Sequence, residues 1–457
     1  MLKSKVAIQV VSSGMLPDDT LMLGDYYVKK WKIPQGQPIT LKFGGFRQHV
    51  KAISAARFDG LRVGQTLARK MGLSGNATLR MQYKADTSTL MLGPLIGVLV
   101  SRDYPQQSEK PFGSITMFCK ELVDACRTHG AYVYFFTPNM IGSNANAVEA
   151  WVYADGWKRA TVPVPDVVNN RLTSRKLENK PSVQQFLKAV KAANRTSVFN
   201  EKFLDKTEVF DALKNDESLI RYLPESHLLR NYTMLKSMCS RYSSVFLKPV
   251  RGSLGKGIIR ISRSEGGEGY QAMFTTAAGA QKQNYGSLLK LFSAISSKMK
   301  SSRYQVQQGL NLIEIQKRPV DFRALVQKNA AGKWTITSIV ARTAGNHHFV
   351  SNLARGGTLS TVTEAVVKSN LSAGVSRTGT PARLRSAALA IAKGIEQHIP
   401  AHFGELGIDL ALDTSGRIWL LEVNSKPSKN DNTPLTDNKI RPSVKLMLQY
   451  SRYLSGF

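Results

Sequence analysis

The first part of the chain carries a pattern of apolar and polar positions that repeats once, 40 residues apart. Leu23-Gly24 matches Val63-Gly64, and residues 39–43 match residues 79–83. Each copy is typical of a helix, a turn and a strand. Because two copies are too few for a solenoid, we predict that residues 1–92 form a duplicated β-rich module that closes into a compact pseudo-symmetric barrel.

Residues 93–180 follow a different pattern. Apolar strands are predicted at 95–100 and 131–136, and the segment between them has apolar residues at steps of three and four before Gly130. A strand, a helix and a strand in that order form a βαβ unit. This part of the chain is therefore predicted to be an α/β domain.

The remaining residues, 181–457, mix helices and strands. They are helical and basic up to about residue 245, β-rich up to about residue 344, and helical again over 381–397, before a final hairpin and a tail. The fold class that follows is α/β (α+β), with several domains.

A glycine-rich loop between two predicted strands is a candidate phosphate site. Residues 245–261 read VFLKPVRGSLGKGIIRI, with Lys248 ahead of the loop. Glycines free the backbone to turn N–H groups toward a phosphate, and the neighbouring Lys and Arg side chains add positive charge. Gly257 follows Lys256 where a P-loop has Ser or Thr, and no helix follows to make a Rossmann turn. A hairpin lid over phosphates and an ordinary glycine-rich hairpin both remain open.

Near the C-terminus, two apolar strands carry acidic side chains on either side of a short turn at 413–416, which predicts a β-hairpin. Pairing outward from the turn places Asp409 opposite Leu420, with Glu422 as its diagonal neighbour and Asn424 on the same face. Two carboxylates and an amide oxygen on an apolar face favour Mg²⁺ or Mn²⁺ between them. The alternative is an exposed polar face in a slipped register.

Composition restricts the partners. The 457 residues are 42% hydrophobic and 21% charged, which is ordinary globular usage and excludes a disordered or fibrous chain. Lys and Arg number 63 against 32 Asp and Glu, so the net charge is +31 and the pI about 10.1. Such a chain attracts polyanions: an anionic polymer, a membrane surface, nucleotide phosphates or, less favoured, nucleic acid.

Cysteine usage and hydropathy indicate a location inside the cell. Cys119, Cys126 and Cys239 are odd in number and lack CxxC spacing, which argues against a disulfide framework and a zinc site. The first two lie on the apolar face of their predicted helix and are expected to be core residues. The apolar stretch 90–100 is too short for a transmembrane segment, and the N-terminal apolar run is too short for a signal peptide. We expect a cytoplasmic protein.

Several motifs, in this order, resemble the ATP-grasp superfamily: Lys248 before a glycine-rich hairpin, Asp321-Phe322-Arg323, Arg342, Asn352 ahead of two glycines, and Asp409 with Glu422-Val423-Asn424. The segments WKRATVPVPDVVNNR, FLDK and PVDFR are similar to the endospore coat-associated YheC/YheD-type family. The resemblance covers most of the chain from Gly93 to about Pro427. It implies an ATP-grasp fold after a pre-ATP-grasp βαβ domain, with a nucleotide lid at about 200–305 and a metal-site core at about 306–430.

The resemblance also implies roles for individual residues. Two phosphate-holding lysines, the closing loop and the segment that meets adenine would bind the nucleotide: Lys206, Lys248, Gly252, Ser253, Gly255, Lys256, Gly257, Gln307, Gln308 and Leu310. Three residues would approach the γ-phosphate or an acyl phosphate: Arg323, Arg342 and Asn352. Three would hold Mg²⁺ (or Mn²⁺): Asp409, Glu422 and Asn424. The following Ser-Lys-Pro-Ser departs from the Pro-Gly ending of many ATP-grasp ligases.

The activity that the resemblance implies is an ATP- and Mg²⁺-dependent carboxylate–amine ligase. ATP would phosphorylate a carboxylate, and an amine would attack the acyl phosphate. The sequence does not identify the acid or the amine. A spore-coat component or an anionic polymer is a further expected partner. The resemblance also implies that the protein is associated with the spore. Two alternatives stay open: a kinase with the same fold, and a non-catalytic basic protein that binds polyanions in spore assembly.

Overall fold

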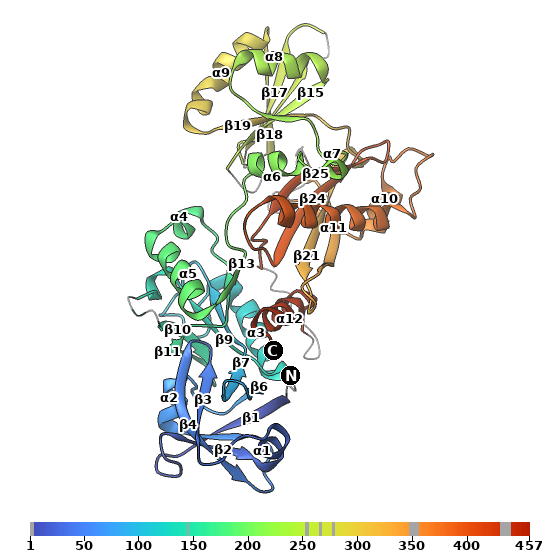
Figure 1. Cartoon of the computed structure of the whole chain (residues 1–457). Helices are drawn as coiled ribbons and strands as arrows, with labels where there is room; N and C mark the ends of the chain where they lie inside the picture. The colour runs from blue at the N-terminus through green and yellow to red at the C-terminus, as the bar shows by residue number, and fades with distance from the viewer. Residues whose placement is uncertain are drawn as a thin grey trace.

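The computed structural model describes residues 4–142, 144, 146–251, 256–264, 267–276, 279–346, 356–429 and 440–457. These described residues form four sheets. In Figure 1 the N-terminal barrel lies at the bottom, a second sheet above it, and two further sheets lead to the top of the view.

The first sheet is a closed barrel in the order β1-β5-β2-β4-β3-β7-β6. Its elements are β1 (Ser4–Val11), β2 (Thr20–Gly24), α1 (Asp25–Trp31), β3 (Pro38–Phe43), β4 (Phe46–Ala55), β5 (Leu61–Gly64), α2 (Gln65–Lys70), β6 (Ala77–Lys84) and β7 (Thr89–Gly93). The sequence repeat appears as β2-α1-β3 and β5-α2-β6, so the duplicated module and its barrel are confirmed.

The second sheet has the order β11-β10-β9-β8-β12-β13. Its elements are β8 (Leu95–Leu99), η1 (Gly113–Ile115), α3 (Thr116–His129), β9 (Tyr132–Phe136), η2 (Pro138–Met140), β10 (Ala147–Tyr153), β11 (Trp157–Pro163), β12 (Val167–Asn170), α4 (Arg175–Glu178), α5 (Pro181–Asn194) and β13 (Ser197–Phe199). The predicted βαβ unit is β8-α3-β9, with β8 and β9 parallel. Cys119 and Cys126 are buried thiols, as expected. The sheet runs past the predicted boundary at residue 180, because β13 pairs with β12.

The C-terminal tail is also part of this layer. It forms α12 (Pro442–Ser455), which lies beside α3 (Figure 1). Its buried residues Val444, Met447 and Leu448 join the core of the second sheet. The sequence analysis assigned no element to this tail; the structure shows that its apolar stripe returns to cover the second sheet.

The third sheet, at the top of Figure 1, has the order β14-β19-β15-β16-β17-β18. Its elements are β14 (Ser226–Leu228), α8 (Tyr232–Arg241), β15 (Ser244–Pro249), β16 (Ile259–Arg263), β17 (Tyr270–Thr276), β18 (Gly279–Tyr285), α9 (Leu288–Ser301) and β19 (Tyr304–Gln308). We call it the lid sheet. It begins later than predicted, because α6 (Lys206–Leu213) and α7 (Glu217–Ile220) bury their apolar residues in the core of the fourth sheet.

The fourth sheet, which we call the core sheet, has the order β23-β22-β21-β24-β25, with β20 paired to β21. Its elements are β20 (Glu314–Ile315), β21 (Arg318–Lys328), β22 (Trp334–Thr343), β23 (Thr358–Ser360), α10 (Val362–Lys368), α11 (Thr380–His398), β24 (Glu405–Leu412) and β25 (Ile418–Asn424). The predicted helix over 381–397 and the final hairpin are confirmed as α11 and β24-β25. None of the helices within the described ranges is long and apolar enough to cross a membrane.

Candidate nucleotide and metal site

The β24-β25 hairpin places two carboxylates side by side. Asp409 pairs directly with Glu422, and Asn424 lies two residues further along the same face. The predicted pairing of Asp409 with Leu420 is wrong. A register shift beside Asp409 accommodates an extra residue, Leu421, in β25. Pairing at the turn also starts one residue later than predicted, with Leu412 opposite Ile418, and the two shifts together turn a diagonal neighbour into a direct one.

Two arginines from adjacent strands bind the Asp409 carboxylate. Arg323 of β21 donates to both of its oxygens, with 2.7 Å between Nη2 and Oδ2. Arg342 of β22 lies 3.0 Å from Oδ2 and holds Asp321 through bonds of 2.6 and 2.8 Å. Burial opposes the charge of Asp409, but the two guanidinium groups outweigh it and keep the pKa of this carboxyl below its usual value. The arginines are therefore positioned by carboxylates.

Asp321 belongs to this network but was not among the predicted site residues. It is buried and lies on the same face of β21 as Arg323. The signal was present in the sequence, because Asp321 and Arg323 are two positions apart in a strand and a buried carboxylate needs a cationic partner.

Two lysines approach this face from different elements. Lys206 is the first residue of α6, and its Nζ lies 3.2 Å from Oε1 of Glu422. Lys248 projects from β15 of the lid sheet and donates to Oε1 of Gln307 on β19. Burial, followed by the charge of Lys206, lowers the pKa of Lys248 to about 8, while the charges of Glu422 and Asp409 act in the opposite direction. The lid lysine is thus within electrostatic reach of the core carboxylates.

The segment between lid and core is held by its own hydrogen bonds. Gln307 donates from Nε2 to the Ser226 hydroxyl at 2.9 Å. The backbone N–H of Gln308 donates to the carbonyl of Glu225, and that of Gly309 to the carbonyl of Ser244. These two N–H groups are engaged within the protein. Leu310 follows, half-buried.

The glycine-rich loop joins β15 to β16 in an antiparallel hairpin, as predicted. Lys256 is exposed, and Gly257 has a φ of +71°, a conformation that favours glycine. Gly252, Ser253, Gly255 and Asn352 lie outside the described residues.

The oxygen donors suit a hard divalent cation. Two carboxylates and the amide of Asn424 share one face, although Oδ1 of Asn424 also accepts the Lys426 N–H at 2.9 Å. Among the described residues, no three His, Cys, Asp or Glu side chains gather into a metal-binding group of their own. Mg²⁺ is commonly held by one or two carboxylates together with nucleotide phosphates and water.

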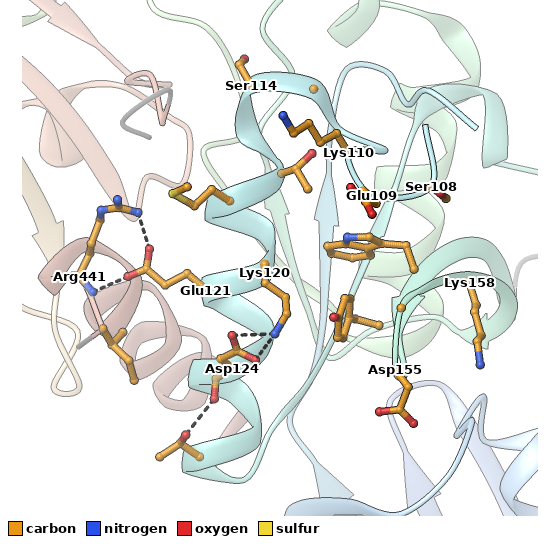
Figure 2. Close-up of a pocket in the computed structure, with 18 residues that line it drawn as sticks. Ser108, Glu109, Lys110, Ser114, Lys120, Glu121, Asp124, Asp155, Lys158 and Arg441 are labelled. Carbon is orange, nitrogen blue, oxygen red and sulfur yellow. Dashed lines mark hydrogen bonds and ion pairs between the residues drawn. The ribbon is translucent and has the colours of Figure 1, made fainter. Parts of the chain in front are cut away.

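A large cavity of about 1330 Å³ lies elsewhere, between α3 and the turn that joins β10 to β11 (Figure 2). Its walls carry charged side chains that pair with one another, Lys120 with Asp124 and Glu121 with Arg441 (Figure 2). None of the predicted site residues lines it, so it is separate from the carboxylate hairpin.

Comparisons with known proteins find a family model, curated relatives and solved structures that are similar to this chain. Residues 195–454 match the family described as YheC/D like ATP-grasp. The endospore coat-associated protein YheD of Bacillus subtilis is 30% identical over 80% of this chain and 80% of its own, and the endospore coat-associated protein YheC of the same organism is 24% identical over 68% of this chain and 85% of its own. Among solved structures, D-alanyl-alanine synthetase A from Vibrio cholerae is 12% identical with a TM-score of 0.44, covering 80% of this chain and 98% of that chain. VanG D-Ala:D-Ser ligase from Enterococcus faecalis is 12% identical with a TM-score of 0.45, covering 79% and 99%. The chain belongs to the YheC/D-like ATP-grasp family and has the ATP-grasp fold.

Proposed function

We propose that this protein is an Mg²⁺-dependent ligase of ATP-grasp type, which activates a carboxylate as an acyl phosphate for attack by an amine. The observation that carries the proposal is that Lys206 pairs with Glu422 on the core hairpin, while Lys248 of the lid sheet lies within electrostatic range of Lys206, Glu422 and Asp409. Two ammonium groups beside two carboxylates suit a nucleotide triphosphate with its divalent cation.

Each group has a role in that reaction. Lys206 and Lys248 hold the phosphates, and Arg323 and Arg342 stabilise the charge on the phosphoryl group in transfer. Asp409, Glu422 and Asn424 hold Mg²⁺, which supplies positive charge between the phosphates. By the resemblance, the loop residues Gly252, Ser253, Gly255, Lys256 and Gly257 would close over the nucleotide, and Asn352 would act together with the arginines.

The proposed reaction needs no covalent intermediate with an enzyme nucleophile. A carboxylate oxygen of the substrate attacks the γ-phosphorus, and ADP leaves. The amine nitrogen then attacks the acyl carbon, phosphate leaves, and the nitrogen loses a proton to give an amide. The names of the two Bacillus subtilis relatives associate them with the endospore coat. We extend that association to this chain and assign synthesis to the cytoplasm, where ATP is supplied.

The first test is Mg²⁺-dependent ATP binding to the wild-type protein, Lys248→Ala and Glu422→Gln. High salt suppresses the non-specific attraction of a chain with a net charge of +31. Lys290→Ala is the matched control for Lys248→Ala, because this exposed lysine lies on α9 of the same lid layer and its loss lowers the net charge by the same one unit. We expect saturable binding that Lys248→Ala and Glu422→Gln weaken and Lys290→Ala leaves intact.

Binding that ignores Mg²⁺ and all three substitutions, and that fades smoothly with salt, would instead identify a polyanion-binding protein. Once binding is established, hydroxylamine can replace the amine. A hydroxamate formed together with ADP and free phosphate supports the ligase, whereas a stable phosphorylated product would identify a kinase.

A further inference from the structure

Glu178 is a buried carboxylate at the end of α4, in the second sheet's layer and outside residues 195–454 of the family match. Its Oε1 accepts the backbone N–H of Phe203 at 2.9 Å. Its Oε2 accepts from the Lys426 ammonium and, at 3.3 Å, from the amide of Asn170. One side chain therefore touches three segments that are far apart along the chain.

Two of these segments lead directly into the candidate site. Phe203 comes three residues before Lys206, and Lys426 comes two residues after Asn424. The segments also meet directly, because the Ser425 hydroxyl donates to the carbonyl of Lys202 at 2.8 Å. The position of Lys206 relative to the end of β25 thus depends on what holds these segments together.

The contact between Glu178 and Lys426 is an ion pair almost sealed from water. The side chain of Lys426 is 1% exposed and that of Glu178 is 5% exposed. A buried charge that loses its partner is costly, so each member fixes the place of the other. Lys426 is fixed further by its backbone N–H, which donates to Asn424.

We propose that Glu178 is a positioning residue for the nucleotide and metal site. It sets the distance between Lys206 at the start of α6 and the face of the hairpin that carries Asp409, Glu422 and Asn424. The inference rests on the proposed function and extends it, because it assigns part of the site's geometry to the second sheet's layer. Groups that orient metal ligands typically change metal affinity 10–100-fold when they are altered.

The test compares Glu178→Gln with the double variant Glu178→Gln/Lys426→Met. Glutamine keeps the shape of the side chain and one carbonyl oxygen, but its NH2 group replaces one of the two acceptors that face Lys426 and the Phe203 N–H, and the negative charge is lost. Methionine removes the ammonium that has lost its partner. Glu121→Gln is the control, because Glu121 is another largely buried carboxylate, paired with Arg441 through bonds of 2.5 and 2.6 Å (Figure 2).

The readouts are the dissociation constant of ATP with and without Mg²⁺, the urea midpoint, and hydrogen exchange at the Phe203 and Lys426 amides. We expect Glu178→Gln to weaken Mg²⁺-dependent ATP binding about 10-fold or more and to speed exchange at both amides. The double variant should recover most of the affinity. Glu121→Gln should lower the urea midpoint without changing the affinity.

Two outcomes would overturn the inference, and they are distinguishable. If the wild type binds Mg²⁺ and ATP and Glu178→Gln binds them equally well, Glu178 has no positioning role while the proposed function stands. If the wild type itself shows no Mg²⁺-dependent ATP binding, the proposed function fails and the inference fails with it.

Discussion

Lys248 lies where burial and a neighbouring ammonium oppose its positive charge, and its pKa is lowered to about 8. Bound phosphates favour the charged form, so they should raise this pKa. Between about pH 8 and pH 9, ATP binding should therefore be accompanied by proton uptake at Lys248. ATP affinity should fall as the pH rises above about 8, because a neutral lysine no longer neutralises phosphate. Calorimetry in buffers of different ionisation enthalpy measures the uptake. Lys248→Arg should abolish it, since a guanidinium stays charged; unchanged uptake would assign the proton to another group.

Asp409 and Glu422 should differ in what their loss costs the fold. Asp409→Asn removes the carboxylate that Arg323 and Arg342 share, and breaking a buried pair typically costs about 3–5 kcal/mol. The Glu422 side chain is 38% exposed and contacts Lys206, so Glu422→Gln should cost less than about 1 kcal/mol. Urea unfolding without nucleotide measures both. Equal losses would show that the arginines do not depend on Asp409.

The period of the strand predicted the shared face of Asp409, Glu422 and Asn424, and that face is observed because the later pairing at the turn and the extra residue Leu421 cancel each other. The partners of these residues could not be predicted in the same way. Glu178 contacts Lys426 only when the second sheet and the core sheet are packed together. The two residues are far apart in the sequence, and no local pattern predicts a contact between them. Local periodicity therefore identifies the candidate ligands, and the tertiary fold identifies the groups that orient them.

At the scale of elements, the link between β15 and β19 depends on a close approach at Gly309. A Cβ there would lie 2.6 Å from the carbonyl oxygen of Ser244, which is backbone and cannot rotate away. Gly309→Ala should cost about 1–3 kcal/mol and weaken ATP binding, because the end of β19 must move away from β15. Gly286→Ala in the same lid layer is the control, since no atom lies within 4 Å of its added Cβ. Unfolding midpoints and ATP affinities are compared for the two variants. A Gly309→Ala variant with the stability and ATP affinity of the wild type would contradict the role of this contact.

Element boundaries were more predictable than pairing. The βαβ unit, α11 and the final hairpin follow from apolar spacing and turn residues. The bulge at Leu421 could not be predicted in this way, because the alternation of apolar and polar residues in β25 does not show which residue is left unpaired. The helical period of α12 was present in Val444, Met447, Leu448 and Ser451, yet its partner α3 lies about 300 residues earlier in the chain.

At the scale of the whole molecule, α12 connects two layers. It packs on α3 and β12 of the second sheet and on β21 and β22 of the core sheet. Gln327 of β21 donates to the carbonyl of Ser443 at 3.0 Å, and the Lys328 ammonium lies 5.6 Å from the centre of the Tyr450 ring. Since β21 also carries Arg323, this helix links the second sheet's layer to the strand that binds Asp409.

Met447 tests that connection because it is buried in α12 with its sulfur 3.0 Å from the amide of Asn169 on β12. Met447→Ala leaves a cavity and should cost about 2–5 kcal/mol. If α12 couples the two layers, hydrogen exchange should speed up in α3 and also in β21. Lys445→Ala, at an exposed position of the same helix, should change neither. Faster exchange confined to α3 would show that α12 belongs to the second sheet alone and leaves the core sheet independent.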